Sequence, residues 1–180
     1  MQYRRSQTAG GTYFFTIVTD ARRRFLCAPQ NIALLRTVFT EIKTNHPFTI
    51  EAIVILPDHL HCLWTLPAGD FDYSMRWRQI KSAFSRQCGQ QCKGEATRAR
   101  VNKKEQPVWQ RRFWEHDIQN ELDFQNHVEY IHYNPVKHGL TNAPADWQYS
   151  SFQRYVDHGI YPYDWGAEKP MKFGDTTGHE

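Results

Sequence analysis

Two histidines that alternate within one predicted strand are the first residues in this chain that could do chemistry. His59 and His61 lie within residues 53–64, an otherwise apolar run, with Leu60 between them. Side chains alternate across a strand, so both imidazoles point to the same face, roughly 7 Å apart at the backbone. A buried imidazole is unfavourable without a partner, which a metal ion, a carbonyl or a carboxylate could supply. The pair alone therefore favours no single partner.

A predicted helix further along the chain carries a second set of reactive groups. Tyr130 and Asn134 are four residues apart, so they are neighbours on one flank of a helix, about 5–6 Å apart. A phenol with its usual pKa of about 10 is neutral near pH 7 and needs help to attack phosphorus. A divalent ion beside it could stabilise charge on the phosphate and on the departing oxygen. Taken singly, Tyr130 could also be a structural tyrosine at the edge of the core, and Asn134 could be no more than the C-terminal residue of a helix before Pro135.

Two neighbours on the same predicted helix are alternatives to these residues. Tyr133 is the competing nucleophile, but it lies on the face away from Asn134. His127 precedes Tyr130 by one turn on the same stripe. We therefore prefer Tyr130 as the nucleophile and keep His127 as a group that supports the metal ligands or replaces one of them.

Basic residues are unevenly distributed along the chain. The net charge is only +3, but cations crowd the first 24 residues and residues 76–112, whereas the last 25 residues are acidic. Such clustering is typical of a protein that binds a phosphate backbone, although charge runs are often only solvated surface. The candidate DNA-binding residues are Arg4, Arg5, Arg22, Arg23, Arg78, Lys81, Arg111 and Arg112.

The elements that must position these groups follow the order strand, helix, strand, strand, helix, strand, helix. The 180 residues suit one domain, which we place at residues 1–165. Apolar periodicity predicts strands at 12–19, 48–56, 59–66 and 108–118, and helices at 31–43, 74–89 and 122–133, the last ending before Pro135. This order predicts an α+β, ferredoxin-like fold: an antiparallel sheet with helices packed on one face.

Two segments fall outside that pattern. Residues 90–106 are polar and basic with few large apolar side chains, which predicts a flexible loop in contact with DNA. Residues 166–180 predict an acidic, disordered tail.

Composition and motifs also indicate where in the cell the protein acts and whether it uses ATP. The four cysteines form no CxxC pair, and the chain has neither a signal peptide nor a run of about 20 apolar residues that could span a membrane. We therefore expect a cytoplasmic, nucleoid-associated protein with reduced thiols. The GxxxxGK[ST] phosphate-binding loop of many ATPases is absent, which argues against ATP use.

Four ordered strings resemble one known family, the REP-associated tyrosine transposases. These belong to the single-tyrosine HUH transposases, named after a His-hydrophobic-His motif. The resemblance covers about residues 3 to 165, and four motifs in one order are more specific than a histidine pair alone. Its strings are residues 10–16, 56–67, 109–116 and 130–139.

The resemblance implies a role for each residue at the site. It makes His59 and His61 metal ligands with Leu60 as the hydrophobic middle residue, Asn134 the third ligand and Tyr130 the nucleophile. The stretch 90–105 is longer than expected for compact members of the family.

The same resemblance implies a substrate and a reaction. The family acts on single-stranded DNA that carries a short palindromic hairpin (a REP or BIME-like element), so a 5′-phosphotyrosine intermediate is expected. The cofactor is Mg²⁺ or Mn²⁺, with stronger binding of Mn²⁺ because it tolerates imidazole better. We expect a monomer, with a dimer as the alternative. The competing hypotheses are a metal-dependent phosphodiesterase that activates water and a non-catalytic protein that binds hairpins.

Overall fold

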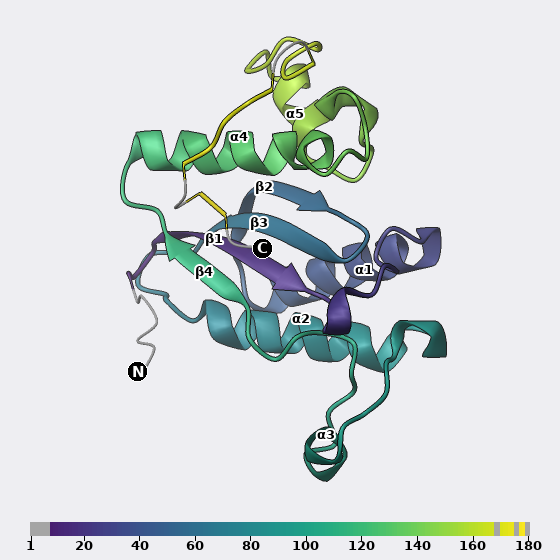
Figure 1. The fold of residues 1–180 in the computed structure, drawn as a ribbon. Coiled ribbons are helices and arrows are strands. Elements are labelled where there is room, and N and C mark those ends of the chain that lie inside the picture. Colours follow the sequence, from purple (N-terminus) through teal and green to yellow (C-terminus); the bar gives the residue numbers. More distant parts are fainter. Residues whose placement is uncertain (1–7, 168–169, 175–176, 179–180) are drawn as a thin grey trace.

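A four-stranded antiparallel sheet forms the centre of the protein (Figure 1). The computed structural model describes residues 8–167, 170–174 and 177–178. Along the sheet the strands follow the order β2-β3-β1-β4. Their bounds are β1 Thr12–Val18, β2 Thr49–Ile55, β3 His59–Thr65 and β4 Trp114–Asp117. Together with the helices between them, these strands confirm the predicted ferredoxin-like α+β fold.

Two helices cover one face of the sheet, α1 (Pro29–Asn45) and α2 (Tyr73–Gln87). The larger apolar core lies between them and the strands, and the rings of Trp64 and Trp77 stack there with centroids 4.2 Å apart. Asp72 caps α2 by accepting a hydrogen bond from the main-chain nitrogen of Met75, as expected for a helix N-cap. This layer stabilises the face of β3 opposite to the two histidines.

The long helix α4 (Glu121–Lys137) covers the other face, as Figure 1 shows. Its apolar residues Val128 and Ile131 pack in a second core cluster with Phe14 and Leu63. The prediction that the helices share one face is therefore wrong for α4. Helical periodicity reveals a buried stripe, but it does not reveal which side of the sheet that stripe covers.

The α4 helix also runs further than its sequence predicted. It passes through Pro135 and ends at Lys137, whereas the Asn-Pro pair predicted an end at residue 133. Proline removes only one main-chain N–H donor, and later donors still form hydrogen bonds at this end of the helix. The main-chain nitrogen of His138 donates to the carbonyl of Asn134, and that of Leu140 donates to the carbonyl of Pro135. The additional turn brings Lys137 onto the flank of α4 that carries Tyr130.

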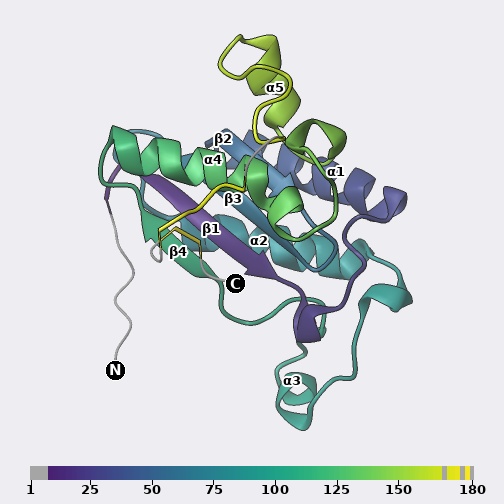
Figure 2. The same cartoon turned by 45° about the horizontal axis from the view of Figure 1, so that its top comes forward.

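Residues 90–106 contain two short helices, η2 (Gln90–Cys92) and α3 (Arg98–Asn102). Figures 1 and 2 both show α3 projecting from the α2 side of the domain. The segment is tied to the body by an ion pair of 2.5 Å between Arg100 and Asp20. The predicted flexibility of this segment stays a prediction.

The remaining elements are short. They are η1 (Asp20–Arg22), η3 (Pro144–Asp146) and α5 (Phe152–Asp157). Of the predicted strand at 108–118, only β4 is regular, although Trp109 forms an isolated bridge with Thr19.

The described part of the C-terminal segment lies against α4. Phe173 contacts the rings of Tyr130 and Tyr133, with centroids 5.3 and 5.8 Å away, and Thr177 is buried. The ring contacts place Phe173 on the face of the sheet that carries the histidines. The predicted disorder of residues 166–180 stays a prediction.

Candidate active site

The histidine pair of β3 faces α4. In the strand register His61 lies opposite Thr16 and His59 opposite Val18, on the same face as Phe14 of the α4-side core. The ring centroids of His59 and His61 are 4.9 Å apart, and the two residues are only 1% and 0% exposed. The same-face placement predicted from the two-residue period of a strand is confirmed.

Hydrogen bonds orient both imidazoles. Nδ1 of His59 is 2.8 Å from Oδ1 of Asp58, and Nδ1 of His61 is 2.9 Å from Oγ1 of Thr16. When Nδ1 of His59 donates its proton to the carboxylate, Nε2 carries the lone pair that binds a metal. An imidazole held by a carboxylate in this way is a common arrangement for a metal ligand.

Tyr130 lies beside these histidines. Its ring centroid is 5.2 Å from that of His61, and Phe14 packs against both rings, 5.4 Å from His61 and 6.0 Å from Tyr130. Asn134 follows one turn later on α4 and is fully buried. The structure therefore brings Tyr130 next to the histidine pair from a segment about 70 residues away in the sequence.

The donor set at this place fits a divalent ion. Two imidazole nitrogens from β3 and the amide oxygen of Asn134 would together offer such an ion a mixed nitrogen and oxygen donor set. Mn²⁺ accepts such mixed nitrogen and oxygen ligands, whereas Mg²⁺ prefers oxygen ligands alone.

Sequence reasoning missed three residues around the site. Asp58 orients His59, and the ring of His138 lies 5.1 Å from that of His59. Lys137 donates a hydrogen bond of 3.0 Å to the hydroxyl of Tyr130, and its ammonium is 4.8 Å from that ring centroid. The signal for Lys137 was present as the spacing i, i+4, i+7 of Tyr130, Asn134 and Lys137, but the predicted helix end concealed it.

His127 lies next to the site, but its hydrogen-bond partner is Asp123. Its Nδ1 is 2.8 Å from the main-chain oxygen of Asp123 and 3.1 Å from the carboxylate, which also lies 2.8 Å from Nε2 of His116. Burial lowers the pKa of His127, so the ring is neutral near pH 7. Its contact with the site runs through Phe14, 4.8 Å from the His127 ring centroid.

His116, Asp123 and His127 are also the kind of residues that hold a metal, with candidate donor atoms within 4.8 Å of one another. The two imidazoles, however, stack nearly parallel at 17°, with centroids 4.7 Å apart. Ring nitrogens bind a metal in the plane of the ring, and parallel planes do not converge on one ion. We interpret the group as a set of hydrogen bonds that joins β4 to the first two turns of α4.

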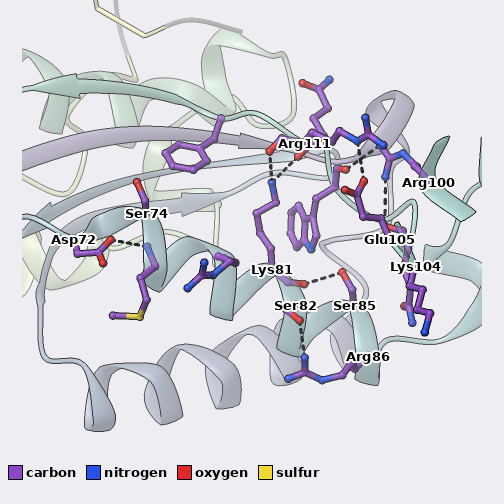
Figure 3. A pocket seen from close by; sticks show the side chains of 16 residues that line it. Asp72, Ser74, Lys81, Ser82, Ser85, Arg86, Arg100, Lys104, Glu105 and Arg111 are labelled. Atoms are coloured by element: carbon purple, nitrogen blue, oxygen red, sulfur yellow. Dashed lines mark hydrogen bonds and ion pairs between the residues drawn. The ribbon is translucent and has the colours of Figure 1, made fainter. Parts of the chain in front are cut away.

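Three of the predicted DNA-binding residues line a single cleft. Arg78, Lys81 and Arg111 contribute to a cavity of about 750 Å³ beside α2, on the opposite side of the sheet from Tyr130. Figure 3 shows Lys81 extending toward Arg111, and its ammonium donates to the carbonyls of Gln110 and Arg111. Further cations at the cleft are Arg86, Arg100 and Lys104, against the acids Asp72 and Glu105.

The other predicted DNA-binding residues are elsewhere. Arg22 pairs with Asp58 at 3.2 Å, and Arg23 donates to the main-chain carbonyls of Gln91 and Cys92. Arg112 is exposed outside the cleft, and Arg4 and Arg5 lie outside the described residues.

The hydroxyl of Tyr130 is covered by the C-terminal segment. Tyr130 is only 2% exposed, with Phe173 edge-on to its ring. Gly178 has a φ of +78°, and a methyl group at this position would overlap the Tyr130 ring. A phosphate can therefore reach the Tyr130 oxygen only after Phe173 and Gly178 move away.

In the part of the chain that the structure describes, we find no helix with the length and apolar character needed to cross a bilayer.

Comparisons with known proteins show which family this chain is similar to. The family model described as "Transposase IS200 like" matches residues 8–134. The chain is 44% identical to the REP-associated tyrosine transposase of Escherichia coli K12 over 167 residues, 93% of this chain and 92% of that protein. It is also 44% identical to a candidate REP-associated tyrosine transposase of Haemophilus influenzae over 170 residues, 94% and 96% of the two chains.

A solved structure shares the fold over the whole chain. It is described as a REP-associated tyrosine transposase bound to a REP hairpin, and it superposes with a TM-score of 0.80 at 41% identity, covering 100% of this chain and 98% of the other. The chain belongs to the REP-associated tyrosine transposases, within the IS200-like transposase family.

Proposed function

We propose that the protein cuts and rejoins single-stranded DNA beside a REP-type hairpin through a phosphodiester of Tyr130. The observation that carries this proposal is the position of the Tyr130 ring, 5.2 Å from His61, with Asn134 on the next turn of α4. The hairpin is proposed as the substrate because the solved relative is described as bound to one.

The reaction exchanges one phosphodiester for another. The Tyr130 oxygen bonds to phosphorus and loses its proton to solvent, while the bond from phosphorus to the 3′ oxygen breaks and that oxygen takes up a proton. The products are a 5′-phosphotyrosine and a free 3′-hydroxyl, which can attack in turn and release Tyr130. No nucleotide is consumed, because the bond energy is kept in the adduct.

His59, His61 and Asn134 are proposed to hold the divalent ion. When bound, such an ion neutralises negative charge on the scissile phosphate. The residues of this chain do the rest: Asp58 and Thr16 fix the imidazoles, and α4 directs Tyr130 toward them. We propose Mn²⁺ or Mg²⁺ as cofactor, with Mn²⁺ bound more tightly.

The basic cleft of Figure 3 is proposed to hold the hairpin by its phosphates. Cleft and nucleophile lie on opposite faces of the sheet, and strand β4 at its edge connects them. Phe113 lines the cleft, whereas its neighbour Trp114 packs on Phe14 with ring centroids 5.7 Å apart. DNA that leaves the cleft can thus reach Tyr130 around the β4 edge. The proposed acting unit is one monomer in the cytoplasm.

The test is a hairpin oligonucleotide labelled on the side 3′ of the expected cut and incubated with the protein and Mn²⁺. On a denaturing gel, wild type is expected to retain label in a protein–DNA adduct, and Tyr130→Phe is expected to lose the adduct while it binds the hairpin normally. Tyr133→Phe, the neighbouring tyrosine on α4, is the matched control and should retain the adduct. Cleavage without an adduct would instead indicate attack by water, and binding without cleavage a non-catalytic hairpin protein.

A further inference from the structure

The ammonium of Lys137 touches the oxygen that the proposed reaction uses. Nζ of Lys137 lies 3.0 Å from the hydroxyl oxygen of Tyr130 and donates to it, and the same Nζ is 4.8 Å from the centroid of that ring. We propose that Lys137 is a catalytic residue that stabilises negative charge on the Tyr130 oxygen during cleavage and during rejoining. The inference rests on the proposed function.

The fold holds Lys137 in this position through α4. Tyr130 and Lys137 are seven residues apart, two turns of one helix, so their side chains share a flank. The contact requires the last turn of α4, which continues through Pro135 and is closed by the hydrogen bond from His138 to Asn134. Lys137 is the last residue of the helix, where the helix dipole favours a cation.

The position suits both directions of the reaction. In cleavage, the Tyr130 oxygen gives up its proton to solvent as it bonds to phosphorus. The ammonium of Lys137 stabilises the negative charge that this oxygen carries before the bond is complete. In rejoining, the 3′-hydroxyl loses its proton to solvent as its oxygen bonds to phosphorus, and the phosphorus–Tyr130 bond breaks, so a phenolate leaves and then takes up a proton from solvent. A hydrogen bond from an ammonium to an anionic oxygen is about twice as strong as one between neutral groups. One residue can therefore lower both barriers.

Lys137 is exposed at the end of α4. Its replacement is therefore not expected to disturb the core. Lys137→Met keeps the length of the stem and removes the charge, and Lys137→Arg keeps a donor and the charge.

The experiment compares single-turnover rates of cleavage and of rejoining with saturating hairpin DNA and Mn²⁺. Lys137→Met is expected to slow both rates about 10- to 100-fold, the range for loss of one hydrogen bond to a charged group. Lys137→Arg is expected to recover most of this loss. Hairpin affinity and melting temperature should stay close to wild type. Lys43→Met, at the last turn of α1, is the matched control and should react normally.

Three outcomes would overturn the inference. Wild-type rates in Lys137→Met would show that the cation has no part in the reaction. A loss explained wholly by weaker hairpin binding would make Lys137 a DNA anchor, and a large fall in melting temperature that Lys137→Arg also shows would make it structural. If wild type forms no adduct at all, the proposed function itself fails; if wild type forms the adduct and the Lys137 variants give one of these three outcomes, this inference alone fails.

Discussion

Oδ1 of Asp58 lies 2.8 Å from Nδ1 of His59, the next residue along the chain, while Oδ2 of the same carboxylate pairs with Arg22 at 3.2 Å. Burial raises the pKa of Asp58, but the hydrogen bonds and charges of His59 and Arg22 outweigh it, so the pKa lies below its usual value. The carboxylate is thus ionised near neutral pH and can hold His59 in the tautomer whose Nε2 accepts a metal.

Asp58→Asn is expected to weaken metal binding. Loss of a carboxylate behind a ligating histidine typically lowers metal affinity 10- to 100-fold, about the change we expect for Mn²⁺. Mn²⁺ titration followed by electron paramagnetic resonance measures it without reference to catalysis. Asp157→Asn, at the exposed end of α5, is the control. Equal Mn²⁺ affinity in Asp58→Asn and wild type would contradict this role for Asp58.

Much of the site could be predicted from local rules. The placement of His59 and His61 on one face follows from the two-residue period of a strand, and the neighbourhood of Tyr130 and Asn134 follows from the helical repeat. That Tyr130 lies beside the histidines does not follow from either period, because it depends on which face of the sheet α4 covers. The partner of each histidine, Asp58 and Thr16, depends on side-chain rotamers and strand register.

The errors also have identifiable causes. Proline disfavours a helix locally, yet α4 continues past Pro135 because later hydrogen bonds and burial of Asn134 and Pro135 stabilise its last turn. The contact of Phe173 with Tyr130 joins residues more than 40 positions apart, and no local pattern in an acidic tail predicts it.

Removal of the Phe173 ring is expected to increase cleavage. Phe173 packs edge-on against Tyr130 and helps to bury the nucleophile, so Phe173→Ala should expose the hydroxyl more often. We expect the single-turnover cleavage rate at saturating hairpin DNA to rise several-fold. Tyr163→Ala, which removes an exposed ring before this segment, should leave the rate unchanged. An unchanged or lower rate in Phe173→Ala would show that the contact does not limit access.

His132 is expected to make the protein less stable in mild acid. Burial lowers the pKa of this fully buried residue to about 3, and the charge of Arg154 adds to the shift. An unfolded histidine titrates near 6.5, so as pH falls below about 6.5 the unfolded state gains a proton that the folded state does not bind. The free energy of unfolding should fall by up to about 1.4 kcal/mol per pH unit between roughly pH 6.5 and 3.

The check is urea unfolding of wild type and His132→Gln at pH 7 and pH 5. The variant loses ring contacts with Tyr155 and Phe152, so it should be less stable at pH 7. Its stability should nevertheless change less between the two pH values. His158→Gln, at the exposed end of α5, should keep the wild-type pH dependence. An equal pH dependence in all three proteins would assign the acid sensitivity to other groups.

Charge removal in the basic cleft is expected to weaken hairpin binding without slowing chemistry. Arg78 and Arg111 line the cleft on the far side of the sheet from Tyr130, so Arg78→Ala with Arg111→Ala should remove the proposed phosphate contacts, together with the 2.7 Å ion pair between Arg111 and Glu105. Each lost contact should lower the slope of log Kd against log salt by about 0.7–0.9. Fluorescence anisotropy at several salt concentrations measures the slope, with Arg36→Ala on the exposed side of α1 as control. A residue that binds DNA phosphates contributes to hairpin affinity and to its salt dependence. An unchanged slope together with a reduced cleavage rate would therefore show that the hairpin binds elsewhere and that the cleft residues have a structural role.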